Sequence, residues 1–163
     1  MTNVFLTRLD SPIGRIELLG DDQAVTALTI ERDGVLPHDD EPERSNPVLE
    51  SARAQLLEYF AGTRTAFDVP VRLVGTPFQE AVWAELVRLG WGEATSYGAL
   101  AAAVGKPGSA RAIGGAVGSN PVPILIGCHR VLASDGRITG YSGGNGVPTK
   151  LWLLGHERIG FAA

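Results

Sequence analysis

The spacing of turn residues along this chain constrains its fold more than any other feature. The first 30 residues hold three short apolar runs, over 3–9, 14–19 and 24–30, each with β-branched or aromatic members. Serine, proline, glycine and aspartate stand between the runs, and this punctuation is typical of consecutive strands. The chain therefore begins with a predicted small sheet.

Helical patterns begin after an acidic, proline-containing stretch that we interpret as a surface loop, residues 33–47. Pro47 can open a helix that runs to Phe60, with Gly62 just past its end. One stripe of that helix is apolar: Leu49, Ala52, Leu56 and Phe60. Residues 67–73 indicate one more strand. The pattern predicts an N-terminal sheet-plus-helix domain over residues 1–75.

Residues 76–163 are predicted to form a second, mainly helical domain. Thr76 and Gln79 make a capping box for a first helix, with Pro77 at its first position. Ser96 and Ser109 can cap two short helices, to Val104 and from Ala110 to about Val117. The glycine-containing turn between these two predicts a helix-turn-helix. An extended stretch over 121–127 and a last helix over 149–157 complete an α/β (α+β) chain.

Composition excludes several classes of protein. No apolar run approaches the roughly 20 residues that span a bilayer, so we expect no membrane association. One cysteine among 163 residues forms no internal disulfide, which favours a reducing, cytoplasmic location. It also argues against a cysteine-rich zinc site, and we predict no metal.

The net charge of −4 is unevenly distributed along the chain: residues 1–50 carry four arginines against eleven acidic residues, whereas residues 86–163 are net basic. An anionic partner on the C-terminal side is compatible with this asymmetry.

The predicted second helix of the pair, "SARAIGGAVGSN", is built almost entirely of small residues around one long cation, Arg111. Each glycine costs a helix about 1 kcal/mol of stability relative to alanine, so the small residues here are unfavourable for the helix itself. The helix also has few large side chains that could pack a core. A small-residue helix fits a DNA minor groove, about 6 Å wide, and Arg111 could fill the space of a displaced base. Tight helix–helix packing with Arg111 in solvent is the alternative.

The lone thiol has unusual neighbours. Cys128 follows an apolar run and directly precedes His129 and Arg130. In extended backbone, adjacent side chains point to opposite sides, so a water would have to link His129 to Cys128. Glu157 shares a helix face with two leucines and could orient His129. The alternatives are an inert core thiol at 128 and a solvent-facing Glu157 at a frayed helix end.

The segments that carry this chemistry resemble a known family. "FQEAVWAEL", "GEATSYGALAAAVG", "ARAIGGAVGSNPVPILIGCHRV", "DGRITGYSGG" and "KLWLLGHE" are similar, in order and spacing, to the O6-alkylguanine-DNA alkyltransferases, also called methylated-DNA–protein-cysteine methyltransferases. The resemblance implies a ribonuclease-H-like first domain and a single-turnover repair enzyme without cofactor. It implies that Cys128 accepts the alkyl group from O6-alkylguanine after base flipping, acting as a thiolate held by His129, through water, and Glu157.

The same resemblance implies roles for further residues. Asn120 would brace the turn before the thiol, and Tyr97 would crowd the phosphate and donate a proton to guanine N3. The DNA-binding residues would be Arg111 as the finger, Tyr97, Ala112, Gly115 and Ser96, in the minor groove. The pocket residues would be Pro123 and Tyr141 as walls, the Ser142 N–H toward O6 and the Val131 carbonyl toward the exocyclic amine. The partner would be alkylated double-stranded DNA, bound by a monomer or by a cooperative array.

One departure from the family pattern concerns residue 127, where proline is usual and this chain has glycine. Because glycine releases the backbone that proline fixes, we expect a looser pocket floor, with an ordering cost of up to about 1 kcal/mol. Two alternatives stay open: a non-catalytic sensor of alkyl lesions with this shape, and a helix-turn-helix regulator with a structural thiol.

Overall fold

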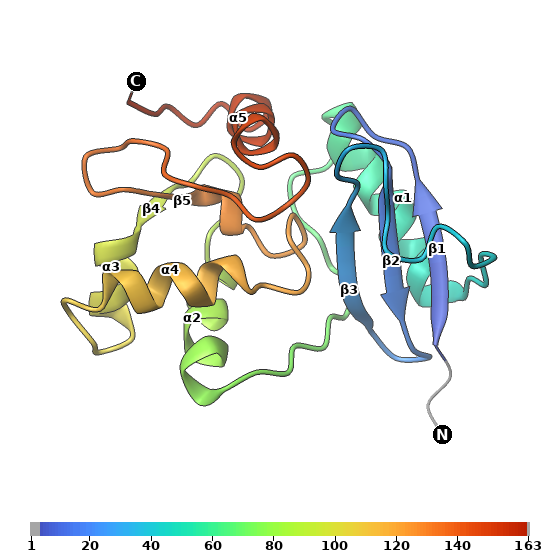
Figure 1. The fold of residues 1–163 in the computed structure, drawn as a ribbon, viewed down its shortest axis with the longest axis horizontal. Coiled ribbons are helices and arrows are strands. Elements are labelled where there is room, and N and C mark those ends of the chain that lie inside the picture. Colours follow the sequence, from blue (N-terminus) through green and yellow to red (C-terminus); the bar gives the residue numbers. More distant parts are fainter. Residues whose placement is uncertain (1–3, 163) are drawn as a thin grey trace. The chain divides into compact units, whose positions relative to one another are not determined.

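The computed structural model describes residues 4–162, and the chain divides into two compact units (Figure 1). The first comprises Met1–Leu73 with Gly143–Asn145, and the second comprises Val74–Ser142 with Gly146–Ala163. The mixed α/β class predicted from the sequence is confirmed. The three residues contributed to the first unit from the glycine-rich loop are held there by Arg32, whose Nε donates to the Gly144 carbonyl at 2.8 Å.

The first unit contains an antiparallel sheet in the order β1-β2-β3. Its strands are β1 (Phe5–Leu9), β2 (Ile16–Gly20) and β3 (Val25–Ile30), close to the predicted runs. Asn3, the predicted start of the first strand, lies outside the described residues. Burial of Ile16, Leu18 and Val25, each without exposed surface, fixes the register, because a slip of one residue would turn these side chains to the other face.

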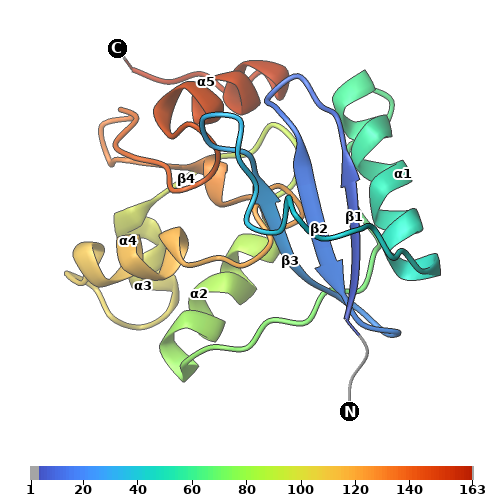
Figure 2. The ribbon, with the colours of Figure 1, turned by 45° about the vertical axis from the view of Figure 1, so that its right-hand side comes forward.

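One helix, α1 (Pro47–Ala61), packs on this sheet (Figure 2). Asn46 caps it by accepting from the Leu49 N–H, and Gly62 ends it in the left-handed conformation at φ 82°. The predicted stripe is right at three positions and wrong at Phe60, which is half-buried, while Tyr59 is fully buried. Tyr59 continues the spacing of the buried Leu49, Ala52 and Leu56 in alternating steps of three and four residues, and Phe60 falls one residue beyond it.

The strand predicted over 67–73 is absent: within this stretch the structure has a single parallel bridge, between Val71 and Val25. Val25 N–H donates to the Pro70 carbonyl, and Arg72 N–H donates to Val25. Pro70 has no N–H to extend the pairing, which limits this stretch to a bridge at the edge of the sheet.

The second unit begins with α2 (Pro77–Val87), and its predicted capping box is present: Thr76 Oγ1 accepts from the Gln79 N–H, and Gln79 Oε1 accepts from the Thr76 N–H. The buried positions are Val82, Trp83 and Leu86. Phe78, Val82, Leu86 and Leu89 recur at helical spacing in the sequence, and only the central two of these four are buried. The Trp83 indole N–H donates to the Ala116 carbonyl at 2.9 Å and thereby joins α2 to a later helix, α4 (Ala110–Gly118).

The helix-turn-helix consists of α3 (Tyr97–Ala103) and α4 (Ala110–Gly118), which pack against each other. Gly105 and Gly108 supply the positive φ values of the turn. Ser96 caps α3 as predicted, with its Oγ accepting from the Ala99 N–H. The cap predicted from Ser109 is wrong: its hydroxyl donates instead to the Lys106 carbonyl within the turn.

The remaining elements bring the cysteine segment beside α3. A parallel pair joins β4 (Thr95–Ser96) to β5 (Val131–Leu132). The 3₁₀ helix η1 (Cys128–Arg130) leads into β5, and α5 (Val147–His156) ends the fold. Among residues 4–162, no helix has the length and apolar character that a membrane span requires.

Candidate active site

The segment before Cys128 is folded back on itself, which corrects the prediction of an extended stretch over 121–127. Ile124 has φ 74°, and Pro123 bridges to Ile126. Asn120 holds this reversal from inside: its Nδ2 donates to the Ile126 carbonyl at 2.9 Å and its Oδ1 accepts from the Val122 N–H at 3.0 Å. The buried amide thus satisfies backbone groups that a tight turn leaves unpaired.

Gly127 forms an inverse γ-turn, with φ −78° and ψ 65° and a bond of 2.8 Å from the Cys128 N–H to the Ile126 carbonyl. This φ lies within the range that proline imposes, so glycine adopts here a backbone that proline would also adopt. Cys128, His129 and Arg130 then form η1. The expectation of extended backbone at these three residues is wrong, and their side chains leave a helical turn instead.

Glu157 is fully buried and joins both neighbours of the thiol. Its Oε2 lies 2.7 Å from His129 Nε2, and its two oxygens accept from Arg130 Nε at 2.8 Å and Nη2 at 3.1 Å. The remaining Arg130 nitrogen, Nη1, donates to the Leu89 carbonyl at 2.7 Å. The frayed, solvent-facing alternative for Glu157 is therefore wrong. A carboxylate this deep in the protein is stabilised because each of its oxygens accepts charge-assisted hydrogen bonds.

The same contacts assign the tautomer of His129. A carboxylate only accepts, so Nε2 carries the ring proton and Nδ1 keeps its lone pair. Within residues 4–162, Nδ1 has no hydrogen-bond partner although it is buried. Burial lowers the pKa of His129 more than Glu157 raises it. His129 is thus a neutral imidazole with an unused acceptor, which is the form a general base needs.

Cys128 is 4% exposed, and burial raises the pKa of its thiol. Hydrogen bonds from Asn120 and Tyr141 and the charge of Lys150 oppose this rise in part. The sulfur lies 3.9 Å from the Tyr141 hydroxyl. Burial therefore favours the protonated thiol, from which the reaction would have to remove a proton, and the thiolate that the resemblance implies stays a prediction.

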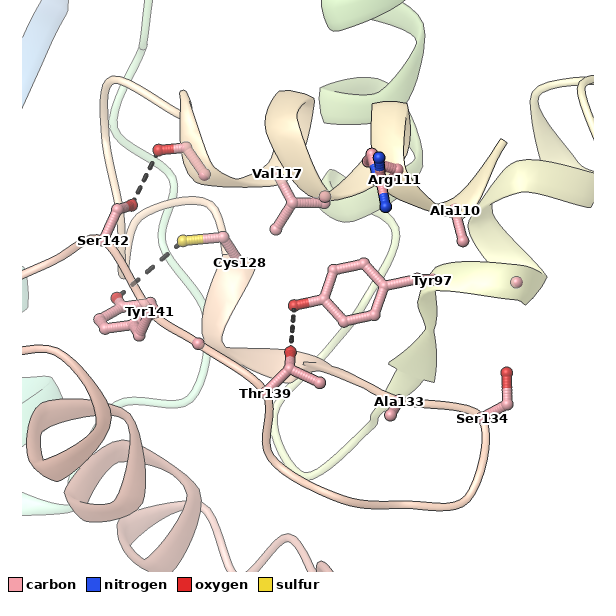
Figure 3. Close-up of a pocket in the computed structure, with 14 residues that line it drawn as sticks. Tyr97, Ala110, Arg111, Val117, Cys128, Ala133, Ser134, Thr139, Tyr141 and Ser142 are labelled. Carbon is pink, nitrogen blue, oxygen red and sulfur yellow. Dashed lines mark hydrogen bonds between the residues drawn. The ribbon is translucent and has the colours of Figure 1, made fainter. Parts of the chain in front are cut away.

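A cavity of about 700 Å³ opens in front of this thiol (Figure 3). Three segments of the second unit line it: α3 with Tyr97, α4 with Arg111 and Val117, and the loop after β5 with Thr139 and Tyr141. The lining is mostly apolar, as is usual where a planar organic group is bound. The inert-thiol alternative is disfavoured, because Cys128 itself lines a cavity large enough for a nucleobase.

Lys150 is a site residue that the sequence interpretation missed. Its side chain is buried, and Nζ donates to the Val131 carbonyl at 2.7 Å and to the Gly140 carbonyl at 3.2 Å. Burial lowers its pKa, and Cys128 opposes that change. The sequence does contain a signal for a buried lysine. Lys150 lies three and four residues before Leu153 and Leu154, so it shares the buried face of α5 with them.

The face of α4 that points away from the core carries small residues and a single long side chain, that of Arg111. Ile113, Ala116 and Val117 are buried, whereas Arg111, Ala112 and Gly115 are exposed. A β-carbon on Gly115 would meet nothing within 4 Å. The helix therefore packs on α2 and α3 with one face and leaves a smooth surface with one cation on the other. Packing and an open small-residue face, which the sequence left as alternatives, occur on opposite sides of the same helix.

Of the other predicted site residues, some line the cavity and some lie outside its lining. Ser142 and Tyr141 line it, and Ser142 Oγ donates to the Gly118 carbonyl at 2.8 Å. Pro123 and Val131 are buried outside the lining, and the Val131 carbonyl already accepts from Lys150. Ser96 stands at the N-terminus of α3. Among residues 4–162, no cluster of three or more His, Cys, Asp or Glu side chains could hold a metal ion.

Comparison with known proteins agrees with this arrangement. Residues 77–159 match the family described as 6-O-methylguanine DNA methyltransferase, DNA binding domain, and residues 4–73 match its ribonuclease-like domain. The chain is similar to the methylated-DNA–protein-cysteine methyltransferase of Haemophilus influenzae, with 37% identity over 98% of this chain and 89% of that protein. The Mycobacterium bovis protein of the same name is 43% identical over 92% of this chain and 90% of its own length.

The solved structures that this chain resembles come from the same family. The crystal structure of Mycobacterium tuberculosis O6-methylguanine methyltransferase superposes with a TM-score of 0.84 and 40% identity, covering 96% of this chain and 93% of that one. A structure of the M. tuberculosis protein in complex with DNA also gives 0.84 and 40%, over 94% and 92% of the two chains. The family models together span nearly the whole chain. By its sequence, its fold and the surroundings of its one cysteine, this chain belongs to the methylated-DNA–protein-cysteine methyltransferase family.

Proposed function

We propose that this protein repairs DNA by direct reversal, taking the alkyl group of O6-alkylguanine irreversibly onto Cys128. The observation that carries the proposal is the position of Cys128 at a cavity of about 700 Å³. Beside it lies the buried cluster of His129 and Arg130, from η1, with Glu157, which caps the end of α5. No cofactor enters, because the lesion itself supplies the transferred group. Double-stranded DNA is the partner, and we propose that the protein binds it as a monomer to which further copies can add cooperatively along the DNA.

The exposed face of α4 supports docking in the minor groove. Ala112 and Gly115 project little or nothing, so phosphates and sugars can come close to the helix. Arg111 stands on that face and also lines the cavity, where it would occupy the gap left by the flipped nucleotide. Extruding the base costs a few kcal/mol, and the arginine offsets part of that cost. Ser96 and Tyr97, at the start of α3, would contact the adjoining backbone.

The transfer is a single in-line displacement. The thiol proton passes through a water to His129 Nδ1, the sulfur forms a bond to the alkyl carbon, and the bond from that carbon to O6 breaks. The bond to the alkyl carbon leaves its electron pair on guanine, which would give the base a negative charge. Tyr97 donates its hydroxyl proton to N3 and cancels that charge, so the base leaves neutral. The product is a thioether at Cys128. Solvent then returns a proton to Tyr97 and removes the one on His129.

The base would be held by groups around the cavity. We propose that the Ser142 N–H approaches O6 and that Tyr141 bounds the alkyl group. Pro123 and the Val131 carbonyl lie outside the cavity lining, so for Pro123 to bound the alkyl group and Val131 to read the exocyclic amine the lining would have to open on binding. Val131 would have to use its second lone pair for this, because Lys150 occupies the first. Asn120 keeps the cysteine segment in its reversed path and acts on the thiol through it.

Intact mass spectrometry tests the proposal. After incubation with duplex DNA containing O6-methylguanine, the protein should gain one methyl group, about 14 Da, on Cys128. Cys128→Ser should gain nothing while still binding the DNA. Wild-type protein that binds the lesion without any gain in mass would overturn the proposal and leave a lesion sensor as the function.

The finger role of Arg111 has a separate test. Arg111→Ala should slow repair of duplex DNA by about tenfold or more, since unpaired extrusion costs a few kcal/mol. Transfer from free O6-benzylguanine, which needs no flipping, should fall much less. Lys106→Ala, in the turn before α4, is the matched control for loss of one positive charge near DNA. An equal loss on both substrates would exclude the finger role.

A further inference from the structure

Tyr97 has a partner in the cavity that the mechanism above does not use. Thr139 Oγ1 lies 3.1 Å from the Tyr97 hydroxyl, and both residues line the cavity (Figure 3). Tyr97 is the first residue of α3, whereas Thr139 belongs to the loop between β5 and α5. The two segments are far apart in the chain, so the contact depends on how that loop is laid across the site.

The ring of Tyr97 lies beside α4. A β-carbon added to Gly114 would stand 3.9 Å from Tyr97 Cε1, so the ring passes α4 at a position without a side chain. Nothing on Gly114 holds the ring, and the Thr139 hydroxyl is the polar contact at the phenol oxygen. That contact limits the directions in which the oxygen can present a proton to a bound base.

The direction of the hydrogen bond matters for the chemistry. Each hydroxyl has one proton to donate and lone pairs to accept. With Thr139 as donor, the phenol oxygen accepts and the Tyr97 proton stays available for a base in the cavity. As that proton moves to the base, negative charge grows on the phenol oxygen, and a hydrogen bond to a charged oxygen is stronger than one to a neutral oxygen. The contact therefore strengthens along the reaction, which is the condition for lowering a barrier.

We propose that Thr139 is a positioning residue for Tyr97, donating to its phenol oxygen, directing the phenol proton toward guanine N3 and stabilising the phenolate as the proton leaves. This proposal rests on the function proposed above. The Tyr97 O–H bond breaks and the N3–H bond forms while the bond from O6 to the alkyl carbon breaks. The Thr139 proton stays on Thr139, and solvent reprotonates the phenolate.

The first test removes the hydroxyl without changing the shape of the side chain. Thr139→Val should transfer the methyl group from saturating O6-methylguanine duplex about three- to tenfold more slowly, which is the value of one hydrogen bond. Thr139→Ser retains the hydroxyl and should stay near the wild-type rate. Equal slowing of the two variants, or a wild-type rate for Thr139→Val, would overturn the proposal. Because Thr139 is exposed, both variants should unfold at the wild-type temperature.

A double-mutant cycle separates this role from a general effect on the loop. In a Tyr97→Phe background, which lacks the phenol oxygen, Thr139→Val should cause no further loss of rate. The same fractional loss in both backgrounds would show that Thr139 acts without Tyr97, and the proposal would fail. The wild-type protein in this experiment also reports on the proposed function: if it gains no methyl group, that function fails first. If it gains the group and the cycle shows no coupling, only the role of Thr139 is lost.

Discussion

A β-carbon added to Gly127 would lie 2.8 Å from Cδ of Arg130 and 2.9 Å from its Nη1, so the arginine side chain occupies the space beside residue 127. That side chain is not free to move, because its guanidinium is held by Glu157 and by the Leu89 carbonyl. The glycine that departs from the family pattern thus makes room for the ion pair behind the thiol. The predicted looser pocket floor remains untested.

Gly127→Ala is expected to displace Arg130 and to destabilise the protein by about 1–3 kcal/mol, as overpacking of a buried site does. Gly155→Ala is the matched control, since a β-carbon there meets nothing within 4 Å and alanine favours the helix. Urea unfolding of the two variants measures the difference. An unchanged free energy of unfolding for Gly127→Ala would mean that Arg130 yields without cost.

Removing the charge of Glu157 should affect both stability and transfer. In Glu157→Gln, the buried Arg130 loses its counter-ion and His129 loses the acceptor that fixes its tautomer, so we expect a loss of about 3–5 kcal/mol. Glu80→Gln, at an exposed position of α2, should change the free energy of unfolding by less than about 0.5 kcal/mol. Calorimetry and single-turnover transfer on the two variants check this. A Glu157→Gln protein as stable as wild type would contradict the assigned network.

The rate of transfer should depend on pH in a way set by two buried groups. Burial lowers the pKa of His129 below its ordinary 6.5, so the base stays neutral as the pH falls through 6.5 and is protonated only at lower pH. Burial raises the pKa of Cys128 above its ordinary 9.0, so the thiol persists through neutral pH. The wild-type rate should therefore be flat between about pH 6.5 and 8.5, between the ordinary values of the two groups.

His129→Gln should replace that plateau with a rate that climbs about tenfold per pH unit, because the thiolate must then form without a base. Rate measurements from pH 5.5 to 9.5 on both proteins separate the two shapes. A plateau retained by His129→Gln would remove His129 from the proton path.

Stability has the matching pH dependence. His129 binds a proton more weakly in the folded than in the unfolded protein, so stability falls as the pH drops below about 6.5 toward the folded pKa. Cys128 holds its proton more tightly when folded, so stability falls as the pH rises past the unfolded value. Thermal unfolding measured from acidic to alkaline pH should show a loss of stability at each end. Cys128→Ser should lack the loss at alkaline pH.

The exposed small-residue face of α4 can be tested without disturbing the fold. Gly115→Gln adds a side chain where nothing lies within 4 Å, so stability should hold or rise while binding to duplex DNA weakens by about tenfold or more. Gly155→Gln places the same side chain on α5, also in open space, and should bind normally. Fluorescence anisotropy with a labelled duplex measures both. Equal affinities for the two variants would move the DNA away from this face.

Lys150 links β5 to the loop that carries Thr139 and Tyr141. Lys150→Met preserves the buried stem but leaves the Val131 and Gly140 carbonyls without their donor, which should cost about 1–3 kcal/mol. Because the charge of Lys150 also lowers the pKa of Cys128, the thiol pKa should rise further in this variant. Titration of the thiol by its ultraviolet absorbance tests that shift, and a fall in the pKa would contradict it.

The sequence by itself located the three strands of the sheet and the starts of two helices. Apolar runs between turn residues marked the strands, and the capping residues Thr76 and Ser96 stand where α2 and α3 begin. Position relative to Leu153 and Leu154 indicated a buried face for Glu157, with a solvent-facing position as the alternative. These features are local, because caps, turns and helix faces depend on residues within one or two turns of the chain.

Only the tertiary structure decided how the site is arranged. The path of residues 121–127 depends on the Asn120 side chain holding the chain in reverse, and no local pattern contains that bond. The contacts of Lys150 with Val131, of Arg130 with Glu157 and of Thr139 with Tyr97 join residues 19 or more positions apart. Burial raises the pKa of Cys128 and lowers that of His129, and burial is a property of the packed whole that residue order alone does not specify.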